Sequence, residues 1–436
     1  MPPRKNKGGL LARVNFPLYT IQMLTSRHVI VGGGGGSSKT GVANGFEIFE
    51  LSHDGWSFVA EEVTRHETGP SVVMNCAAFN DGKRTWLVAG QESHCQLYNV
   101  IPRVLTLENG EIQSKTDKST DEDTQSNVRQ RKLNEKNVTP ENTKEKVQTI
   151  REDNSHVIRK KLQLLLKPST SIQTDFSDSE PLQRIVRVSP NGKVMATGGL
   201  DGVIRLWKFP QLVKLHNLEG HTKEIDDIDF NLSGNLVATI AKDGQAFVWD
   251  VTKGAKHKEL SWNTPDGAKY MYKRLRFRIP LEKKSKTELF MLSNAILAKN
   301  PSYLQLWDVD QGSIVKSVEF KETLSAMAVS DDGKFVAVGT MFSGTVDIFI
   351  AFSLQRALHV PGAHSMFVTG LEFLPTKLDG PAITSNSETA VVSISVDNRI
   401  CIHNIPFRHS LPFWLVIVFI VLSICGALLF CSFMGI

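Results

Sequence analysis

The sequence has little cysteine and no cysteine motif. Its five cysteines are spread over 436 residues without any Cys-x-x-Cys spacing. This pattern supports neither a disulfide framework nor a zinc site, so we expect reduced thiols in the cytosol. The N-terminal segment, residues 1–16, is basic but lacks the continuous apolar core of a secretory signal. No export signal is therefore predicted.

The chain also lacks a strong charge and a recognisable catalytic set. The net charge is only +5, with 22% charged residues, which is too mild to indicate nucleic-acid binding by itself. No Ser/His/Asp or Cys/His arrangement, His-rich metal spacing or carboxylate pair stands out, although distant residues can still converge in a fold. A binding or switching protein is favoured over an enzyme with covalent chemistry.

Charged side chains are missing altogether from Ser410 to Ile436. A membrane helix needs about 20 apolar residues, so this segment predicts a single transmembrane helix with a negligible lumenal tail. Trp414 stands where an interfacial aromatic would anchor it, and the basic Arg408 precedes it. Residues 1–409 are accordingly predicted to be cytosolic. Because the span closes the given sequence, insertion after synthesis is expected, as in tail-anchored proteins.

An internal repeat indicates the fold. The segment Ser189–Trp207 matches Leu232–Trp249 at an offset of about 42 residues, and Trp ends a strand-like stretch in both. Gly220-His221 and Trp249-Asp250 supply the dipeptides typical of a WD repeat. The prediction is an all-β, seven-bladed WD-repeat β-propeller followed by the C-terminal helix.

Positions comparable to the two tryptophans predict one strand in each of the seven blades. They are Phe49, Tyr98, Trp207, Trp249, Trp307, Phe349 and His403. Ala241 stands where WD repeats often carry the Ser or Thr that links the buried hydrogen bonds, so we expect mainly apolar packing. Little chain follows His403 before the helix, so residues near Leu10–Val14 are predicted to complete the last blade.

Two insertions are expected. Residues 111–160 contain no aromatic residue and are rich in charged and polar side chains, which predicts disorder. Residues 264–287 are predicted to be an inserted loop. Within it, Lys269–Ile279 alternates basic and apolar residues as a half-exposed strand would. Its basic side chains could meet anionic lipid head groups or form a solvated strand face, and both alternatives stay open.

The stretch Val31–Gly45 reads VGGGGGSSKTGVANG, and its run of glycines offers bare backbone. It is predicted to join a strand at His28–Val31 to a strand at Phe46–Leu51. A phosphate-binding loop is disfavoured because Ser38 precedes Lys39 and no helix follows. A flexible linker and a recognition loop for a partner or an ion remain as alternatives, and the second is favoured.

Several motifs occur together with this loop. They are GGGGSSKTGVANG (Gly33–Gly45), MNCA (Met74–Ala77), AGQESHCQL (Ala89–Leu97), QTDFS (Gln173–Ser177) and IAFSLQ (Ile350–Gln355). With the C-terminal helix, this combination resembles the prolactin regulatory element-binding protein family, the animal endoplasmic-reticulum exchange factor for the Sar-type small GTPase.

The resemblance implies a guanine-nucleotide exchange factor at the endoplasmic reticulum membrane that releases GDP from a Sar-type GTPase and so starts COPII coat assembly. It also implies a potassium ion held by backbone carbonyls somewhere in Gly32 to Asn44, and no directly bound nucleotide. A membrane-anchored scaffold without exchange activity and a DNA-binding transcriptional regulator remain alternatives.

The GTPase-binding residues that this resemblance implies are those of the loop. They are Gly32, Gly33, Gly34, Gly35, Gly36, Ser37, Ser38, Lys39, Thr40, Gly41 and Asn44. The first five are expected to set the conformation and the next four to make direct contacts. Lys39 either reaches an acidic residue of the GTPase or stays solvated.

Overall fold

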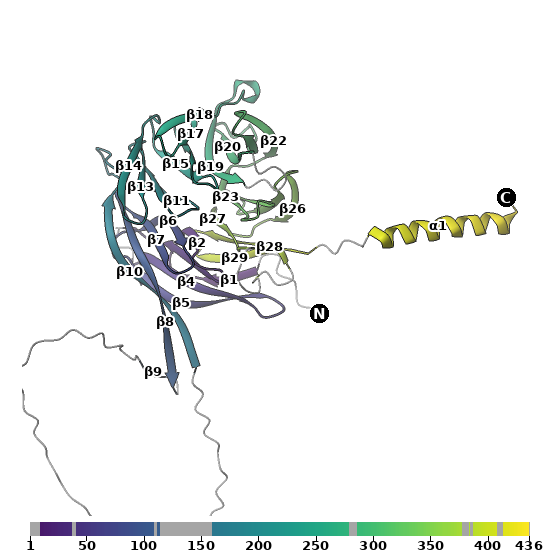
Figure 1. Cartoon of the computed structure of the whole chain (residues 1–436), viewed down its shortest axis with the longest axis horizontal. Helices are drawn as coiled ribbons and strands as arrows, with labels where there is room; N and C mark the ends of the chain where they lie inside the picture. The colour runs from purple at the N-terminus through teal and green to yellow at the C-terminus, as the bar shows by residue number, and fades with distance from the viewer. Residues whose placement is uncertain are drawn as a thin grey trace, which may run out of the picture. The chain divides into compact units, whose positions relative to one another are not determined.

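The protein is a β-propeller followed by one helix (Figure 1). The computed structural model describes residues 9–36, 41–108, 111–113, 159–278, 286–376, 383, 387–407 and 413–435. Within these ranges, seven antiparallel sheets, each with four strands in its main order, form the blades. The predicted fold class is therefore confirmed.

The strands follow the chain blade by blade. Blade 1 contains β2 (Leu18–Met23), β3 (His28–Gly33), β4 (Gly45–His53) and β5 (Phe58–Glu67). Blade 2 contains β6 (Val73–Asn80), β7 (Thr85–Gln91), β8 (His94–Glu108) and β10 (Arg159–Gln173). Blade 3 contains β11 (Gln183–Val188), β12 (Val194–Gly199), β13 (Ile204–Lys208) and β14 (Val213–Leu218).

The second half of the propeller repeats the same order. Blade 4 contains β15 (Ile225–Phe230), β16 (Leu236–Ala241), β17 (Ala246–Asp250) and β18 (Ala255–Glu259). Blade 5 contains β19 (Tyr270–Arg278), β20 (Glu288–Ala295), β21 (Ser302–Asp308) and β22 (Ser313–Phe320), preceded by the 3-10 turn η1 (Pro265–Gly267). Blade 6 contains β23 (Leu324–Val329), β24 (Phe335–Thr340), β25 (Val346–Ile350) and β26 (Gln355–Val360).

Blade 7 combines both ends of the propeller. It contains β27 (Val368–Phe373), β28 (Ser387–Ser395) and β29 (Arg399–Pro406), and β1 (Gly9–Arg13) forms its outer strand. Gly9 lies opposite Ile402, and Arg13 lies opposite Arg399. The predicted closure by N-terminal residues is confirmed, since these residues supply the edge that the C-terminal part of the chain leaves open.

All seven positions predicted from the tryptophan spacing lie on the third strand of their blades and are buried. The expectation about Ala241 was wrong, because Thr239 carries out the linking role. Thr239 Oγ1 lies 2.9 Å from both His221 Nε2 and Trp249 Nε1, while His221 Nδ1 lies 3.0 Å from Asp243 Oδ2. The hydrogen-bonded set is therefore complete in blade 4.

The prediction of an inserted loop at residues 264–287 is largely wrong. Its centre is β19, the inner strand of blade 5, so it belongs to the propeller itself. The predicted strand character of Lys269–Ile279 is confirmed for Tyr270–Arg278. Its arginines contact carboxylates of the fold, as described below, so this strand does not present the cationic lipid contact considered above.

The predicted disordered insertion at residues 111–160 falls mostly outside the described residues. At its borders, β9 (Glu111–Gln113) pairs with the end of β8, and β10 begins at Arg159.

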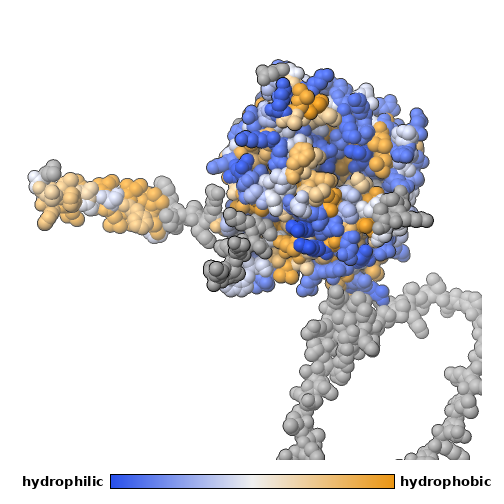
Figure 2. Space-filling model, turned by 180° about the vertical axis from the view of Figure 1, so that it is seen from behind, coloured by the Kyte–Doolittle hydropathy of each residue, from blue (hydrophilic) through white to orange (hydrophobic). Residues whose placement is uncertain are grey.

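The helix α1 (Phe413–Met434) is apolar along its whole length and exposed. Figure 2 shows it as an almost continuously hydrophobic cylinder, whereas the propeller surface mixes hydrophilic and hydrophobic residues. Its window Trp414–Cys431 is long and apolar enough to cross a membrane.

The propeller has two faces, and each carries one functional feature. Because neighbouring strands are antiparallel, the third strand of every blade starts at one face and ends at the other. We call the face at the start of β4 the glycine-loop face. The opposite face, where β29 ends at Pro406, is the tether face.

Candidate functional site

The glycine-rich loop lies between β3 and β4 of blade 1. The two strands pair to their ends, with Gly32 opposite Phe46 and Gly33 opposite Gly45. The glycine run therefore begins inside a strand, which corrects the prediction that all five glycines belong to the loop. Residues 37–40, predicted to make direct contacts, lie outside the described residues.

Gly32 and Gly33 are required by close packing. A Cβ atom on Gly33 would lie 1.9 Å from the carbonyl oxygen of Pro17. A Cβ on Gly32 would lie 3.0 Å from side-chain atoms of Phe46, Thr20 and Val73. Larger side chains would therefore force β2 and β3 apart, so these two glycines serve the fold of blade 1.

The next glycines set the course of the loop. Gly34 has φ +143°, and a Cβ there would lie 2.1 Å from Asn44 Oδ1. Gly36 and Gly41 have φ +83° and +77° and open space around their Cα atoms. Both glycines have a backbone conformation that other residues rarely adopt.

Asn44 fixes this loop from inside. Its side chain is buried, and its Oδ1 accepts a hydrogen bond from Gly36 N at 2.9 Å. Its Nδ2 lies 3.1, 3.0 and 3.1 Å from the carbonyl oxygens of Gly36, Gly69 and Pro70. Asn44 therefore connects the glycine loop to the β5–β6 connection.

Sequence reasoning missed Gly69 and Pro70 as part of the site. The sequence signal there was an ordinary Gly-Pro pair between strands. Thr68 N also donates to Asn44 O at 3.0 Å, which adds a main-chain link between the two connections. The site is thus a pair of adjacent loops held together by one amide side chain.

Exposed apolar residues also lie on the glycine-loop face outside this loop. They come from turns and connections of other blades: Phe176, Ile296, Leu297, Phe342 and Met366, each about half exposed or more. These side chains offer apolar contact points for a protein partner outside the loop.

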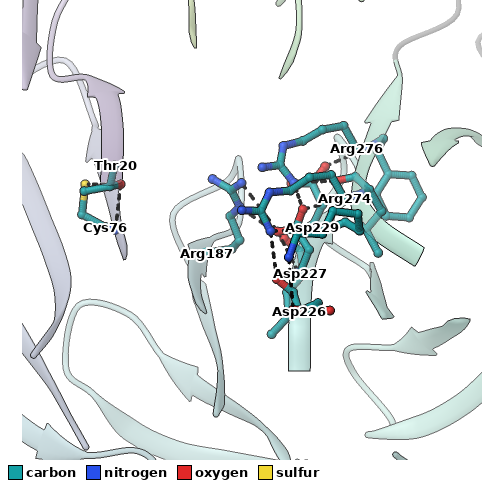
Figure 3. Close-up of polar contacts among 12 residues, drawn as sticks. Thr20, Cys76, Arg187, Asp226, Asp227, Asp229, Arg274 and Arg276 are labelled. Atoms are coloured by element: carbon teal, nitrogen blue, oxygen red, sulfur yellow. Dashed lines mark hydrogen bonds and ion pairs between the residues drawn. The ribbon is translucent and has the colours of Figure 1, made fainter. Parts of the chain in front are cut away.

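The axial channel is a second candidate site, and its charges serve the fold. A cavity of about 360 Å³ lies along the inner strands. Figure 3 shows acidic side chains of β15 meeting arginines of β11 and β19. Asp227 Oδ2 lies 2.6 Å from Arg276 Nη1, and Phe277 N donates to Asp229 Oδ2 at 2.8 Å. These contacts join blades 3, 4 and 5.

Burial shifts the pKa of several channel groups. It raises the pKa of Asp229 and of Glu372 to about 7, although the nearby Arg187 acts in the opposite direction. Burial also raises the pKa of the Cys76 thiol to about 12, so this thiol stays protonated and its Sγ lies 3.2 Å from Thr20 Oγ1. A protonated thiol is a poor nucleophile.

Within the described residues, no group of three or more His, Cys, Asp or Glu side chains could hold a metal ion. A monovalent cation uses other ligands, namely neutral carbonyl oxygens. Three such oxygens, from Gly36, Gly69 and Pro70, converge on the Asn44 amide. In ligand type, this part of the loop fits potassium.

Known proteins match this chain over nearly its whole length. It is 32% identical over 423 residues to the guanine nucleotide-exchange factor SEC12 of Rattus norvegicus, with 95% of this chain and 94% of that protein covered. The SEC12 of Mus musculus is 32% identical over 427 residues, with the same coverage. The SEC12-like protein 1 of Arabidopsis thaliana is 29% identical over 216 residues, covering 48% of this chain and 49% of that protein. The profile of the WD domain, G-beta repeat, matches residues 179–208 and 212–250.

Proposed function

Because the chain belongs to the SEC12 family of guanine nucleotide-exchange factors, we propose that its glycine-rich loop binds a Sar-type small GTPase and promotes GDP release. GTP then enters the empty site, and the loaded GTPase starts COPII coat assembly at the endoplasmic reticulum. The resemblance found in the sequence and the full-length matches support the same function.

The observation that carries this proposal is the construction of the loop. Asn44 holds the main chain of Gly36 at the rim of a face that also exposes apolar side chains. Exchange requires no covalent step. The loop must bind the nucleotide-free GTPase more tightly than the GDP-bound form, because only a difference in affinity shifts the equilibrium. Each 1.4 kcal/mol of that difference changes the population about tenfold.

The family resemblance implies a potassium ion, and it belongs to the same proposal. The carbonyl oxygens of Gly36, Gly69 and Pro70 are the ligands we propose for it, with Asn44 holding the two connections at the correct spacing. A bound cation would supply positive charge that keeps these carbonyls together. Replacing potassium by sodium in the release assay tests this requirement.

The helix α1 is proposed to anchor the protein in the endoplasmic reticulum membrane, with the propeller in the cytosol. Its length and composition support a single span, and Trp414 near its start is half exposed and suits the interface. Tethering to the membrane raises the effective concentration of the propeller toward a GTPase that also binds membranes.

The experiment that tests the function is GDP release from a purified Sar-type GTPase by the full chain in detergent. The variant lacks residues 37–40 and keeps the packing glycines Gly32 and Gly33 and the anchoring Asn44. We expect release to slow at least about tenfold, as loss of about 1.4 kcal/mol of differential binding predicts. Equal release by both proteins would leave a scaffold without exchange activity at this loop.

A further inference from the structure

Three exposed aromatic side chains stand on the tether face. Trp56 is 95% exposed in the turn after β4, Phe352 is 61% exposed in the turn after β25, and Phe407 is 53% exposed just after β29. Each follows the third strand of its blade, so all three lie on one face. Their blades 1, 6 and 7 are neighbours, because β2 packs against β27 and β23 packs against β27.

The turn that carries Trp56 is firmly built. Asp54 Oδ1 accepts hydrogen bonds from Trp56 N at 2.8 Å and Ser57 N at 2.7 Å, and Asp54 N donates to Ser57 O at 3.1 Å. Gly55 has φ +98°, which a larger residue would rarely adopt. A fixed turn that holds a large indole in solvent has no role in the core of the propeller.

The β4–β5 hairpin is also fixed beside the last blade. Its residues Phe58 and Ala60 pack against the cluster that contains Ile400 and Ile402 of β29. Phe352 is held by its own turn, because the neighbouring Ala351 and Leu354 are buried and Lys316 Nζ of blade 5 donates to Phe352 O at 2.7 Å. Trp56 and Phe352 thus lie on the two blades that flank blade 7, from which the chain leaves the propeller after Phe407.

The chain length brings this point close to a membrane. Phe407 ends the described part of the propeller, and α1 begins at Phe413. A fully extended chain spans at most ~3.6 Å per residue, so the segment from Phe407 to Phe413 reaches about 20 Å. If α1 spans a bilayer, the tether face around Phe407 lies within that distance of its surface.

We propose that Trp56, Phe352 and Phe407 insert into the interfacial region of the bilayer that α1 spans. Aromatic rings favour this region because one part of it is apolar and another is hydrated. The inserted rings hold the tether face against the membrane and direct the glycine-loop face away from it. The proposal depends on the anchoring proposed above but not on exchange activity.

Charge does not provide an alternative explanation for this contact. Among the described turns of this face in blades 1, 2 and 6, Arg27, Lys83, Arg84 and Lys334 are basic, whereas Asp54, Asp81, Asp331 and Asp332 are acidic. Such a mixed face gives little net attraction to anionic lipids. We therefore expect the contact to form on zwitterionic bilayers as well as on anionic ones.

Tryptophan quenching in the full chain tests the proposal. The protein is reconstituted into phosphatidylcholine liposomes, and quenching is measured with lipids brominated near the glycerol end and with acrylamide in the water. Comparison of the wild type with Trp56→Phe gives the contribution of Trp56. Trp262→Phe is the control for the opposite face, because the partly buried Trp262 lies in the β18–β19 connection on the glycine-loop face. Trp414→Phe reports the insertion of α1.

We expect brominated lipid to quench the fluorescence of Trp56. Acrylamide should quench Trp56 in liposomes at most about half as strongly as it does in the detergent-solubilised chain. Phe352→Ser with Phe407→Ser should reduce the lipid quenching of Trp56 and leave that of Trp414 unchanged. If Trp414 is quenched by lipid while Trp56 is quenched only by acrylamide, the proposal is wrong. If neither is quenched by lipid, the anchoring and this inference both fail, whereas GDP release in detergent tests exchange separately.

Discussion

At the scale of single residues, Asn44 determines the conformation of the glycine loop. One buried amide contacts Gly36 from both its oxygen and its nitrogen and reaches Gly69 and Pro70 as well. A single hydrogen bond of this kind contributes about 0.5–1.5 kcal/mol. Loss of all of them should release the loop without unfolding blade 1, because β3 and β4 keep their own ladder.

The first prediction concerns Asn44→Ala. We expect the rate of GDP release from the GTPase to fall at least about tenfold, because the loop then has to be ordered on binding. The matched control is Asn80→Ala, which removes an amide that bridges Gly82 N and Thr85 Oγ1 on the tether face. A similar loss of activity in both variants would contradict a specific role for Asn44.

The second prediction concerns the channel carboxyl Glu372. Burial raises its pKa in the folded chain to about 7, above the ordinary value of about 4.3, so the folded chain binds a proton more strongly than the unfolded chain. The stability that this proton provides is present at low pH and is lost as the pH rises from about 4 through 7. Glu372→Gln removes this dependence.

The free energy of unfolding of Glu372→Gln, taken relative to that of the wild type, should therefore be about 1 kcal/mol higher at pH 8 than at pH 5. The difference is this small because water in the channel weakens the effect of burial. The measurement is the denaturation midpoint of the detergent-solubilised chain at both pH values. Glu61→Gln, on the exposed part of β5, is the control. A midpoint difference that is the same at both pH values would disprove the role assigned to Glu372.

At the scale of elements, β1 closes the propeller. It covers β29 with backbone hydrogen bonds and brings Val14 and Phe16 into the cluster between blades 7 and 1. Without β1, one strand edge and the apolar side chains beneath it would be exposed. Exposed edges and exposed apolar surface both destabilise a closed β-fold.

The third prediction is that removal of residues 1–15 lowers the thermal midpoint of the chain by several degrees or more, as loss of a few kcal/mol implies. The comparison uses differential scanning fluorimetry of the full and shortened chains in the same detergent. Removal of residues 1–8 alone, before β1 begins, serves as the control. An unchanged midpoint after the longer deletion would mean that β1 adds little to closure.

The sequence was sufficient to predict elements that repeat along it. Trp207 and Trp249 gave the blade period because each blade buries an aromatic residue at the same strand position. The role of Thr239 was missed, because the linking hydroxyl lies two residues before Ala241, on the same face of β16. The strand character of β19 was predicted, but the strand was assigned to an insertion because its basic side chains pair with acids that are distant in sequence, as Arg276 does with Asp227.

The same limit applies to the loop itself. Its glycines were recognisable, but their separate roles depend on contacts with Pro17 and with Asn44, which only the folded blade brings close. Gly69 and Pro70 gave no local signal that they share a side chain with the loop. Local patterns therefore pointed to the loop as a candidate site, and nonlocal packing determines the shape of its described part.

At the scale of the whole molecule, we propose that the propeller separates two tasks. The glycine-loop face presents bare main chain and exposed apolar residues to a protein, and the tether face presents aromatic residues where the chain continues to α1. The inner strands between them are joined by apolar packing and charge pairs. Such a scaffold can hold a GTPase at a fixed orientation to the membrane.

The central claim is that this loop distinguishes the nucleotide-free GTPase from its GDP-bound form. The most direct test is the affinity of the full chain for each form, measured for the wild type and for the variant lacking residues 37–40. We predict that the wild type binds the nucleotide-free form at least about tenfold more tightly, and that the variant loses most of this preference. An equal preference in both proteins would show that the discrimination arises elsewhere on the propeller.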